Sequence, residues 1–383
     1  SLAGMTWTRH HAVLNVLDDV KNRLHVLTPP DDGRGEWVRS AFPAEGGVLA
    51  IGAGAVDPVE SDDVWVVTTG YLTPSTLSLA TVAPTAPEPT PTIPEPTPTI
   101  PEPTPTIPEP VEGSLRTGSP TGDDPSSLRQ AQGEPSSGIV RSGAVEQLKA
   151  APAFFDATGL VTEQRFATSL DGTRVPYFVV GTPAQLHPEP GAEPAPTLLY
   201  GYGGFEISLT PGYSGAVGRA WLARGGVYAV ANIRGGGEYG PGWHQAALKQ
   251  HRHRAFEDFA AVADDLVAAG ITVPGRLGAQ GGSNGGLLMG NMLTQYPERF
   301  GAIVVQVPLL DMKRYSHLLA GASWMAEYGD PDTADWSFIQ TFSPYHLFDP
   351  AKTYPATLFT TSTKDDRVHP GHARKMMAKM EAA

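Results

Sequence analysis

Short apolar runs separated by polar turns occur through the first 83 residues, which is typical of an all-β segment. Residues 12–17 and 23–27 form one pair of such runs around a polar turn, and residues 64–69 and 76–81 form another. Each pair predicts a β-hairpin. Because four to six short strands are too few to close a stable β-structure, we expect this segment to be part of a larger all-β domain.

From about residue 160 the pattern changes to apolar runs that alternate with helical periodicity. Residues 164–168 and 175–180 flank Asp171-Gly172, which is a hairpin signal. Further apolar runs predict strands at 197–200, 226–231, 276–280, 302–305 and 357–360. One helix face carries Phe256, Phe259, Ala260, Ala263 and Leu266. Strands that alternate with helices indicate an α/β fold with a mostly parallel sheet.

A low-complexity segment, residues 84–143, separates these two parts. From Pro87 to Ile107 the unit Pro-Glu-Pro-Thr-Pro-Thr-Ile occurs three times, and so many prolines predict a semi-rigid polyproline II rod. Residues 111–143 are rich in Gly, Ser and Asp and almost free of apolar side chains, so we expect them to be disordered. A spacer is the favoured interpretation, and a ligand for a proline-recognition domain is the alternative.

The stretch Gly281-Gly282-Ser283-Asn284-Gly285 reads G-x-S-x-G between a predicted strand and a predicted helix. This is the context of a nucleophile elbow, in which serine lies at a strained turn and glycines let strand and helix pass closely. The backbone N–H of Asn284 would then point to a developing oxyanion. A chance glycine-rich turn gives the same letters, but the flanks favour the elbow. A serine elbow on a parallel sheet predicts an α/β-hydrolase fold.

A hydrolase serine also needs an oxyanion hole, a base, and an acid that orients the base. Residues 200–205, Tyr-Gly-Tyr-Gly-Gly-Phe, directly follow a predicted strand and offer close backbone approach and tyrosine hydroxyl donors. A plain tight turn is the other interpretation. Residues 364–367 contain two aspartates after a strand end, where such sheets hold functional groups. A solvated charge cluster explains them equally well.

Two further patterns suggest other chemistry and are set aside. Gly235–Gly240 matches G-x-G-x-x-G after a strand, but Pro241-Gly242 follows, so we expect no helix there to hold a dinucleotide. His244, His251 and His253 lack the spacing of a helix-borne pair of metal ligands in a strongly polar region. We interpret them as surface histidines and expect no metal.

Composition narrows the function classes. The 383 residues include no cysteine, which excludes a thiolate nucleophile and favours a reducing compartment: the cytoplasm, with the periplasm as the alternative. A net charge of −13 argues against nucleic-acid binding. The sequence contains no run of 18 apolar residues, so we expect no membrane span. The first four residues carry no signal-peptide features, and we interpret this start as an arbitrary cut, which leaves the compartment open.

From about Ala153 to Ala383 the chain closely resembles prolyl oligopeptidases, serine peptidases that join an α/β-hydrolase domain to a seven-bladed β-propeller. The matching stretches are residues 200–205, 231–240, 281–288, 324–329 and 365–368. The resemblance implies terminal propeller blades in 1–83, the last propeller strand and the hinge in 144–160, and a C-terminally truncated hydrolase domain in 161–383. It also implies a monomer that needs no cofactor and acts on short proline-containing peptides.

The resemblance assigns roles by position. The nucleophile would be Ser283 and the triad acid Asp365, and the oxyanion would be held by Tyr202 and the N–H of Asn284. A substrate carbonyl would be held by Arg367. A proline ring would stack on Trp324 within pocket walls formed by Phe205, Leu309, Tyr328 and Val368. An aromatic surface selects an apolar, rigid ring through burial rather than hydrogen bonds.

The chain also departs from the family pattern. Only about 80 to 100 residues correspond to a propeller of several hundred, and the proline-rich segment interrupts a hairpin between Thr81 and Val145. The catalytic histidine of the family lies some tens of residues after the acid, whereas His369 and His372 are too close to Asp365 in sequence. We therefore expect the base to be missing and this chain to be inactive alone.

Three hypotheses about function stay open. Cleavage after proline is the first. A related specificity is the second, either dipeptide release or cleavage after basic residues, for which Glu327 is the only local acidic candidate. The third is a catalytically dead module that binds proline-rich peptides.

Overall fold

The computed structural model describes residues 1–30, 33–42, 48–83 and 145–383. The proline-rich repeats and the rest of the predicted low-complexity segment lie outside these residues. All of the described residues belong to one compact unit. Among them, no helix combines the length and the apolar character that crossing a membrane requires.

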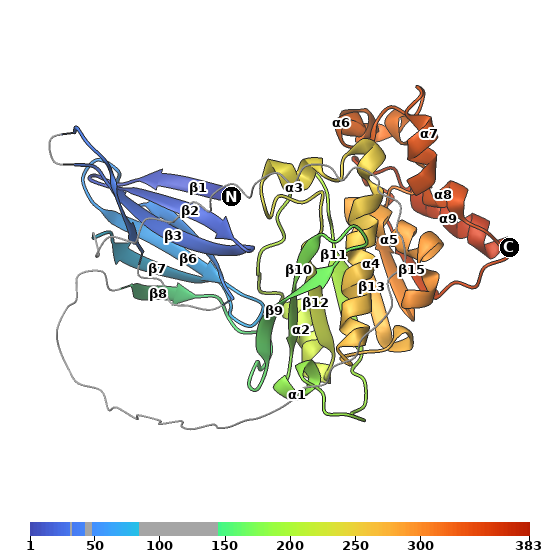
Figure 1. Cartoon of the computed structure of the whole chain (residues 1–383), viewed down its shortest axis with the longest axis horizontal. Helices are drawn as coiled ribbons and strands as arrows, with labels where there is room; N and C mark the ends of the chain where they lie inside the picture. The colour runs from blue at the N-terminus through green and yellow to red at the C-terminus, as the bar shows by residue number, and fades with distance from the viewer. Residues whose placement is uncertain (31–32, 43–47, 84–144) are drawn as a thin grey trace, which may run out of the picture. The chain divides into compact units, whose positions relative to one another are not determined.

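The N-terminal part forms two four-stranded antiparallel sheets (Figure 1). The first has the order β1-β2-β3-β4, with bounds Leu2–Trp7, Ala12–Asp18, Lys21–Thr28 and Val38–Ala41. The second has the order β5-β6-β7-β8, with bounds Ala50–Ala55, Asp63–Thr69, Thr76–Thr81 and Glu146–Ala150. Both predicted hairpins are confirmed, because β2 pairs with β3 and β6 with β7.

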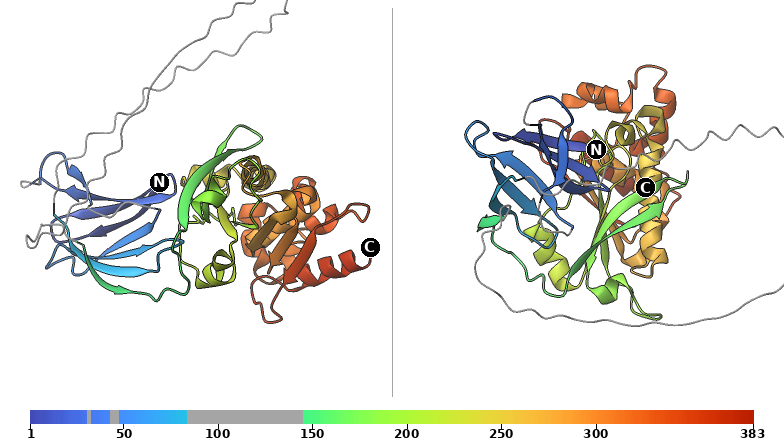
Figure 2. Two further views of the ribbon diagram at one scale, coloured as in Figure 1. Left: turned by 90° about the horizontal axis from the view of Figure 1, so that it is seen from below. Right: turned by 60° about the vertical axis from the view of Figure 1, so that its left-hand side comes forward.

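Alternation along the strands explains how these two sheets pack. In β6, Val64 and Val66 are buried whereas Trp65 and Val67 are exposed. Buried side chains from both sheets meet in one apolar cluster of Val13, Leu24, Val26, Phe42, Ile51, Val64, Val66, Ala80 and Val82. Figure 2 shows the two sheets, in dark and lighter blue, next to each other. Each sheet thus buries its apolar face against the other.

The last strand of the second sheet comes from beyond residues 84–144. Leu79 of β7 lies opposite Glu146 of β8, and Thr76 lies opposite Ala150. The strands before and after that segment therefore pair directly, as the two arms of a hairpin do.

The remaining strands form a seven-stranded sheet in the order β15-β14-β13-β11-β12-β10-β9. In chain order, β9 to β15 are Val161–Thr168, Arg174–Gly181, Thr197–Gly201, Val227–Ala231, Leu277–Gly282, Ala302–Gln306 and Ala356–Thr360. The neighbours among β11 to β15 are parallel. Strands β9 and β10 form the predicted hairpin, and β10 joins β12 in antiparallel fashion. The mostly parallel sheet of the predicted α/β-hydrolase fold is confirmed.

The α-helices α1 to α9 are Pro183–Leu186, Gly215–Ala220, Pro241–Gln245, His253–Ala268, Asn284–Gln295, Met325–Tyr328, Trp336–Ile339, Pro344–Leu347 and Gly371–Glu381. The predicted apolar face of α4 is buried throughout and contacts β9, β10 and α5. Helix α5 contacts β13 and β14 and is buried almost along its whole length.

The topology brings three predicted site segments to one edge of the sheet. Strand β11 ends one residue before Tyr202, β13 ends one residue before Ser283, and the turn with Asp365 follows β15. Because these strands are parallel, their carboxyl ends lie along the same edge, where open α/β sheets bind ligands.

Candidate active site

Ser283 lies at the sharp turn between β13 and α5. Its φ is 59° and its ψ is −116°, a region that residues other than glycine rarely adopt. A Cβ on Gly281 would lie 2.4 Å from the carbonyl oxygen of Gly285. One on Gly285 would lie 2.7 Å from that of Gly201. The glycines therefore permit the close passage of strand and helix that the elbow motif predicts.

Tyr202 lies beside the serine. Burial raises the pKa of its phenol, and smaller effects of Arg252 and of a hydrogen bond with the Ser283 side chain oppose that rise. The phenol therefore keeps its proton at neutral pH and can donate a hydrogen bond. A donor that stays neutral next to the serine is what an oxyanion hole requires.

Asn284, the first residue of α5, is completely buried and holds the loop of Tyr202 in place. Its Nδ2 donates to the carbonyl oxygen of Tyr202 at 2.5 Å. Its Oδ1 accepts from Arg252 Nη2 at 2.5 Å and from the Tyr328 hydroxyl at 2.7 Å. The side chain thus joins α5, the helix that follows Ser283, to three other segments, so the backbone N–H of Asn284 has a fixed position.

The side chains predicted to form the pocket walls lie in or against one apolar cluster. Leu309, Tyr328 and Val368 are buried members, and Phe205 and Trp324 are partly buried and pack against it. The Phe205 and Tyr328 rings meet edge to face, with centroids 5.7 Å apart. Their segments therefore supply an apolar wall next to the loop that carries Tyr202.

Asp365 lies in a tight turn after β15. One of its carboxylate oxygens, Oδ1, accepts from the backbone N–H of Arg367 at 3.0 Å and of Val368 at 2.9 Å. The carbonyl oxygen of Arg367 accepts from Ala320 N–H at 3.3 Å, which ties this turn to the 3₁₀ segment Leu319–Trp324. The Arg367 side chain is exposed.

The two histidines after Asp365 have other partners. His369 Nδ1 accepts from the Gly371 N–H at 2.9 Å. His372 is buried, and its Nδ1 accepts from the N–H groups of Leu310 and Asp311 at 3.3 and 3.1 Å. Burial lowers the pKa of His372 to about 4. It is therefore neutral at pH 7 and supports the backbone next to Leu309.

The prediction about the glycine-rich loop needs correction. A short helix, α3, does begin at Pro241, since proline is well suited to the first helical position. The space beside these glycines is nevertheless occupied by the backbone of another loop. A Cβ on Gly235 would lie 2.5 Å from the Gly203 carbonyl oxygen, and one on Gly237 would lie 2.2 Å from that of Glu206. These glycines allow two loops to pack together.

The interpretation of His244 as a surface histidine is also wrong. Its side chain is only 18% exposed, and its Nε2 lies 2.7 Å from Glu327 Oε2. Glu327 in turn binds Arg252, which is 1% exposed and precedes α4. Sequence reasoning missed Arg252, because its partners lie 32 to 75 positions away and no local pattern marks it.

Within the described ranges, no group of three or more His, Asp or Glu side chains is arranged to hold a metal ion.

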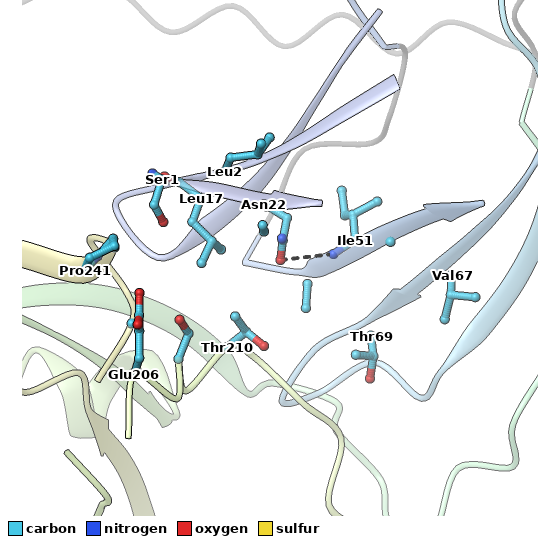
Figure 3. Close-up of a pocket in the computed structure, with 16 residues that line it drawn as sticks. Ser1, Leu2, Leu17, Asn22, Ile51, Val67, Thr69, Glu206, Thr210 and Pro241 are labelled. Carbon is cyan, nitrogen blue, oxygen red and sulfur yellow. Dashed lines mark hydrogen bonds between the residues drawn. The ribbon is translucent and has the colours of Figure 1, made fainter. Parts of the chain in front are cut away.

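A cavity of about 930 Å³ opens beside Glu206, four residues after Tyr202 (Figure 3). Glu206, Thr210 and Pro241 line it on one side, and Leu17 and Ile51 are among its lining residues from the N-terminal sheets. Ser283 is not among its lining residues.

Comparison with known proteins identifies the family. The sequence model of the prolyl oligopeptidase family matches residues 215–383. A post-proline cleaving enzyme from Rickettsia typhi has a similar structure across the whole chain, with a TM-score of 0.73 and 30% identity. A structure from a mechanistic analysis of two prolyl endopeptidases gives a TM-score of 0.76 and 32% identity, again across the whole chain. The chain belongs to the prolyl oligopeptidase family.

Curated members of this family agree. An uncharacterized peptidase, y4nA, of Sinorhizobium fredii is 40% identical over the whole chain, which spans 43% of that relative. The prolyl endopeptidase of Elizabethkingia miricola is 39% identical over 63% of the chain and 34% of its own length. The two solved enzymes are covered to 45% and 46%. The chain therefore spans less than half the length of these prolyl oligopeptidase relatives.

Proposed function

We propose that the full-length protein is a serine peptidase that cleaves short peptides on the carboxyl side of proline. The observation that carries this proposal is the strained Ser283 elbow next to an apolar, aromatic wall that includes Trp324. A proline ring is apolar and rigid, so such a wall can select it through burial rather than through hydrogen bonds. The names of the related enzymes, prolyl endopeptidase and post-proline cleaving enzyme, support the same specificity.

In the proposed reaction the Ser283 Oγ attacks the carbonyl carbon of proline, and a base removes the hydroxyl proton. The oxyanion of the tetrahedral intermediate accepts hydrogen bonds from the Tyr202 hydroxyl and the Asn284 N–H. Collapse expels the amine, which takes up the proton from the base, and leaves an acyl-enzyme. Water then hydrolyses this ester by the same steps. Asp365 would orient the base, and Arg367 would hold a second substrate carbonyl.

Cleavage after basic residues finds no support at Glu327. Its Oε1 accepts from Arg252 and from the Phe205 N–H, its Oε2 binds His244, and the side chain is only 4% exposed. A carboxylate with these partners has no place for a substrate cation. The apolar specificity is therefore the better supported one.

The base of this reaction is proposed to lie outside residues 1–383. Asp365 Oδ1 is bound by backbone N–H groups, and the described contacts of His369 and His372 lie within their own segment or at Leu310 and Asp311. Purified residues 1–383 should therefore hydrolyse a chromogenic proline substrate no faster than their Ser283→Ala variant. Turnover that His369→Ala or His372→Ala abolishes would contradict this part of the proposal.

A fluorophosphonate probe tests whether the full-length protein is an enzyme at all. Such probes phosphonylate a serine only where it is activated, so we expect an adduct on the peptide with Ser283 and none in Ser283→Ala. An unlabelled Ser283 in the folded full-length protein would refute the peptidase and leave the proline-peptide binding module.

A further inference from the structure

A buried guanidinium links the three segments that surround the elbow. Arg252 Nη1 donates to Glu327 Oε1 at 2.8 Å. Its Nη2 donates to the carbonyl oxygen of Gly203 at 2.7 Å and to Asn284 Oδ1 at 2.5 Å. One side chain therefore connects α6, the oxyanion loop (residues 202–206) and the nucleophile's helix. The planar fork of arginine makes these contacts possible at once.

Glu327 binds the same loop at a second point. Its Oε1 also accepts from the Phe205 N–H at 3.0 Å, two residues after the carbonyl that Arg252 binds. Between these two contacts the backbone is unusual, because Gly203 and Phe205 have φ values of 63° and 56°. A phenylalanine in this region is strained and persists only where its surroundings impose the conformation. The ion pair supplies one hydrogen bond at each end of the strained stretch.

The charged pair is also connected to both residues that are expected to bind the oxyanion, to Asn284 directly and to Tyr202 through Asn284. Asn284, which Arg252 contacts, donates its Nδ2 to the Tyr202 carbonyl oxygen. The phenol of Tyr202 and the N–H of Asn284 are the two donors in the proposed reaction. Neither Arg252 nor Glu327 lies where substrate would touch it, since they are 1% and 4% exposed.

We infer that Arg252 and Glu327 are positioning residues that set the geometry of the oxyanion hole through Tyr202 and Asn284. This inference rests on the proposed serine-hydrolase function of Ser283. Two buried charges are costly even when they are paired, and an apolar pair would fill the same space without that cost. The contacts to Gly203 and Phe205 are what an apolar pair could not provide.

The test is a double-mutant cycle in the full-length protein. Glu327→Gln keeps the size of the side chain and an oxygen acceptor but removes the charge that pairs with Arg252. Loss of one oxyanion donor lowers kcat by roughly 10²–10³-fold, so a displaced pair of donors should lower it by roughly tenfold or more, with KM within about twofold. In a Tyr202→Phe background the same substitution should lower kcat by a clearly smaller factor than in wild type, because one of the two donors that it positions is already absent and only the Asn284 N–H is left to displace.

A matched control is Asp265→Asn on α4. It makes the same carboxylate-to-amide change at a residue that accepts from the Tyr177 hydroxyl at 2.5 Å, and Tyr177 lies on β10 rather than on the oxyanion loop. We expect its kcat to stay within about twofold of wild type. The second variant is Arg252→Lys, which keeps the charge but not the fork, and it should reproduce the Glu327→Gln signature.

Several outcomes would overturn the inference: an unchanged kcat in Glu327→Gln, an undiminished effect in the Tyr202→Phe background, or loss of folding in both variants. The last outcome would assign the pair to fold stability alone. The rate of fluorophosphonate labelling at Ser283 is measured in parallel, since it depends on the oxyanion hole but not on proline specificity. If the wild-type protein reacts with the fluorophosphonate but does not cleave proline peptides, the proposed specificity fails. The double-mutant cycle is then measured from the labelling rates instead of kcat.

Discussion

Replacing Trp324 by alanine in the full-length protein should weaken turnover of proline substrates in particular. Trp324 is only partly buried and packs against the core cluster that includes Tyr328, so part of its indole face is free to cover a substrate ring. An indole buries 150–250 Å² in total, and if about 100 Å² of contact is lost, ~25 cal/mol per Å² gives roughly 2–3 kcal/mol. This corresponds to a loss of roughly 30- to 150-fold in kcat/KM.

The assay compares two chromogenic peptides that differ only in proline or alanine at the cleaved position. Trp324→Ala should reduce the preference for proline, and Trp324→Phe, which keeps an aromatic face, should retain most of it. Melting temperatures of both variants check that the 3₁₀ segment tied to Arg367 has stayed folded. Equal losses on the proline and alanine peptides would refute the stacking role and leave Trp324 as a core residue.

Three further predictions concern stability. Deleting residues 84–143, with Ala83 joined to Ala144, should leave the melting temperature nearly unchanged, because β7 and β8 pair without them; a large drop would contradict this. The pKa of buried His372 is about 4, below its value in the unfolded chain, so the protein should lose up to roughly 3 kcal/mol of stability as pH falls from about 6.5 to 4. In His372→Gln the free energy of unfolding, measured with urea, should depend less on pH in that range. Burial raises the pKa of Glu238 to about 7, so the stability that its protonated form contributes is complete below about pH 4.5 and is lost as pH rises through 7. Glu238→Gln should remove this loss of stability, and an unchanged dependence of stability on pH would refute the raised pKa of Glu238.

Local patterns were sufficient for the elements whose periodicity is strong. The apolar face of α4 from Phe256 to Leu266, the two hairpins of the N-terminal sheets, and the strand and helix around Ser283 all follow from residue spacing alone. The strands β1 and β4 were not predicted, because their apolar residues are exposed at sheet edges and show no clean alternation.

Tertiary partners explain what the sequence could not reveal about the site. His244 and Arg252 lie in a polar stretch, and only the fold brings Glu327 to both of them. Pro241-Gly242 looks like a helix breaker, yet proline begins α3. The role of Asn284 was predicted from its backbone alone, whereas its side chain joins Tyr202, Arg252 and Tyr328.

The central claim, that Ser283 drives cleavage after proline, is tested most directly by product mapping. The full-length protein is incubated with a mixture of short peptides that contain one proline each, and the fragments are sequenced by mass spectrometry, with Ser283→Ala as the control. We predict new carboxyl termini at proline in the wild-type reaction and none in the variant. Cleavage at other residues, or cleavage after proline that persists in Ser283→Ala, would contradict the account.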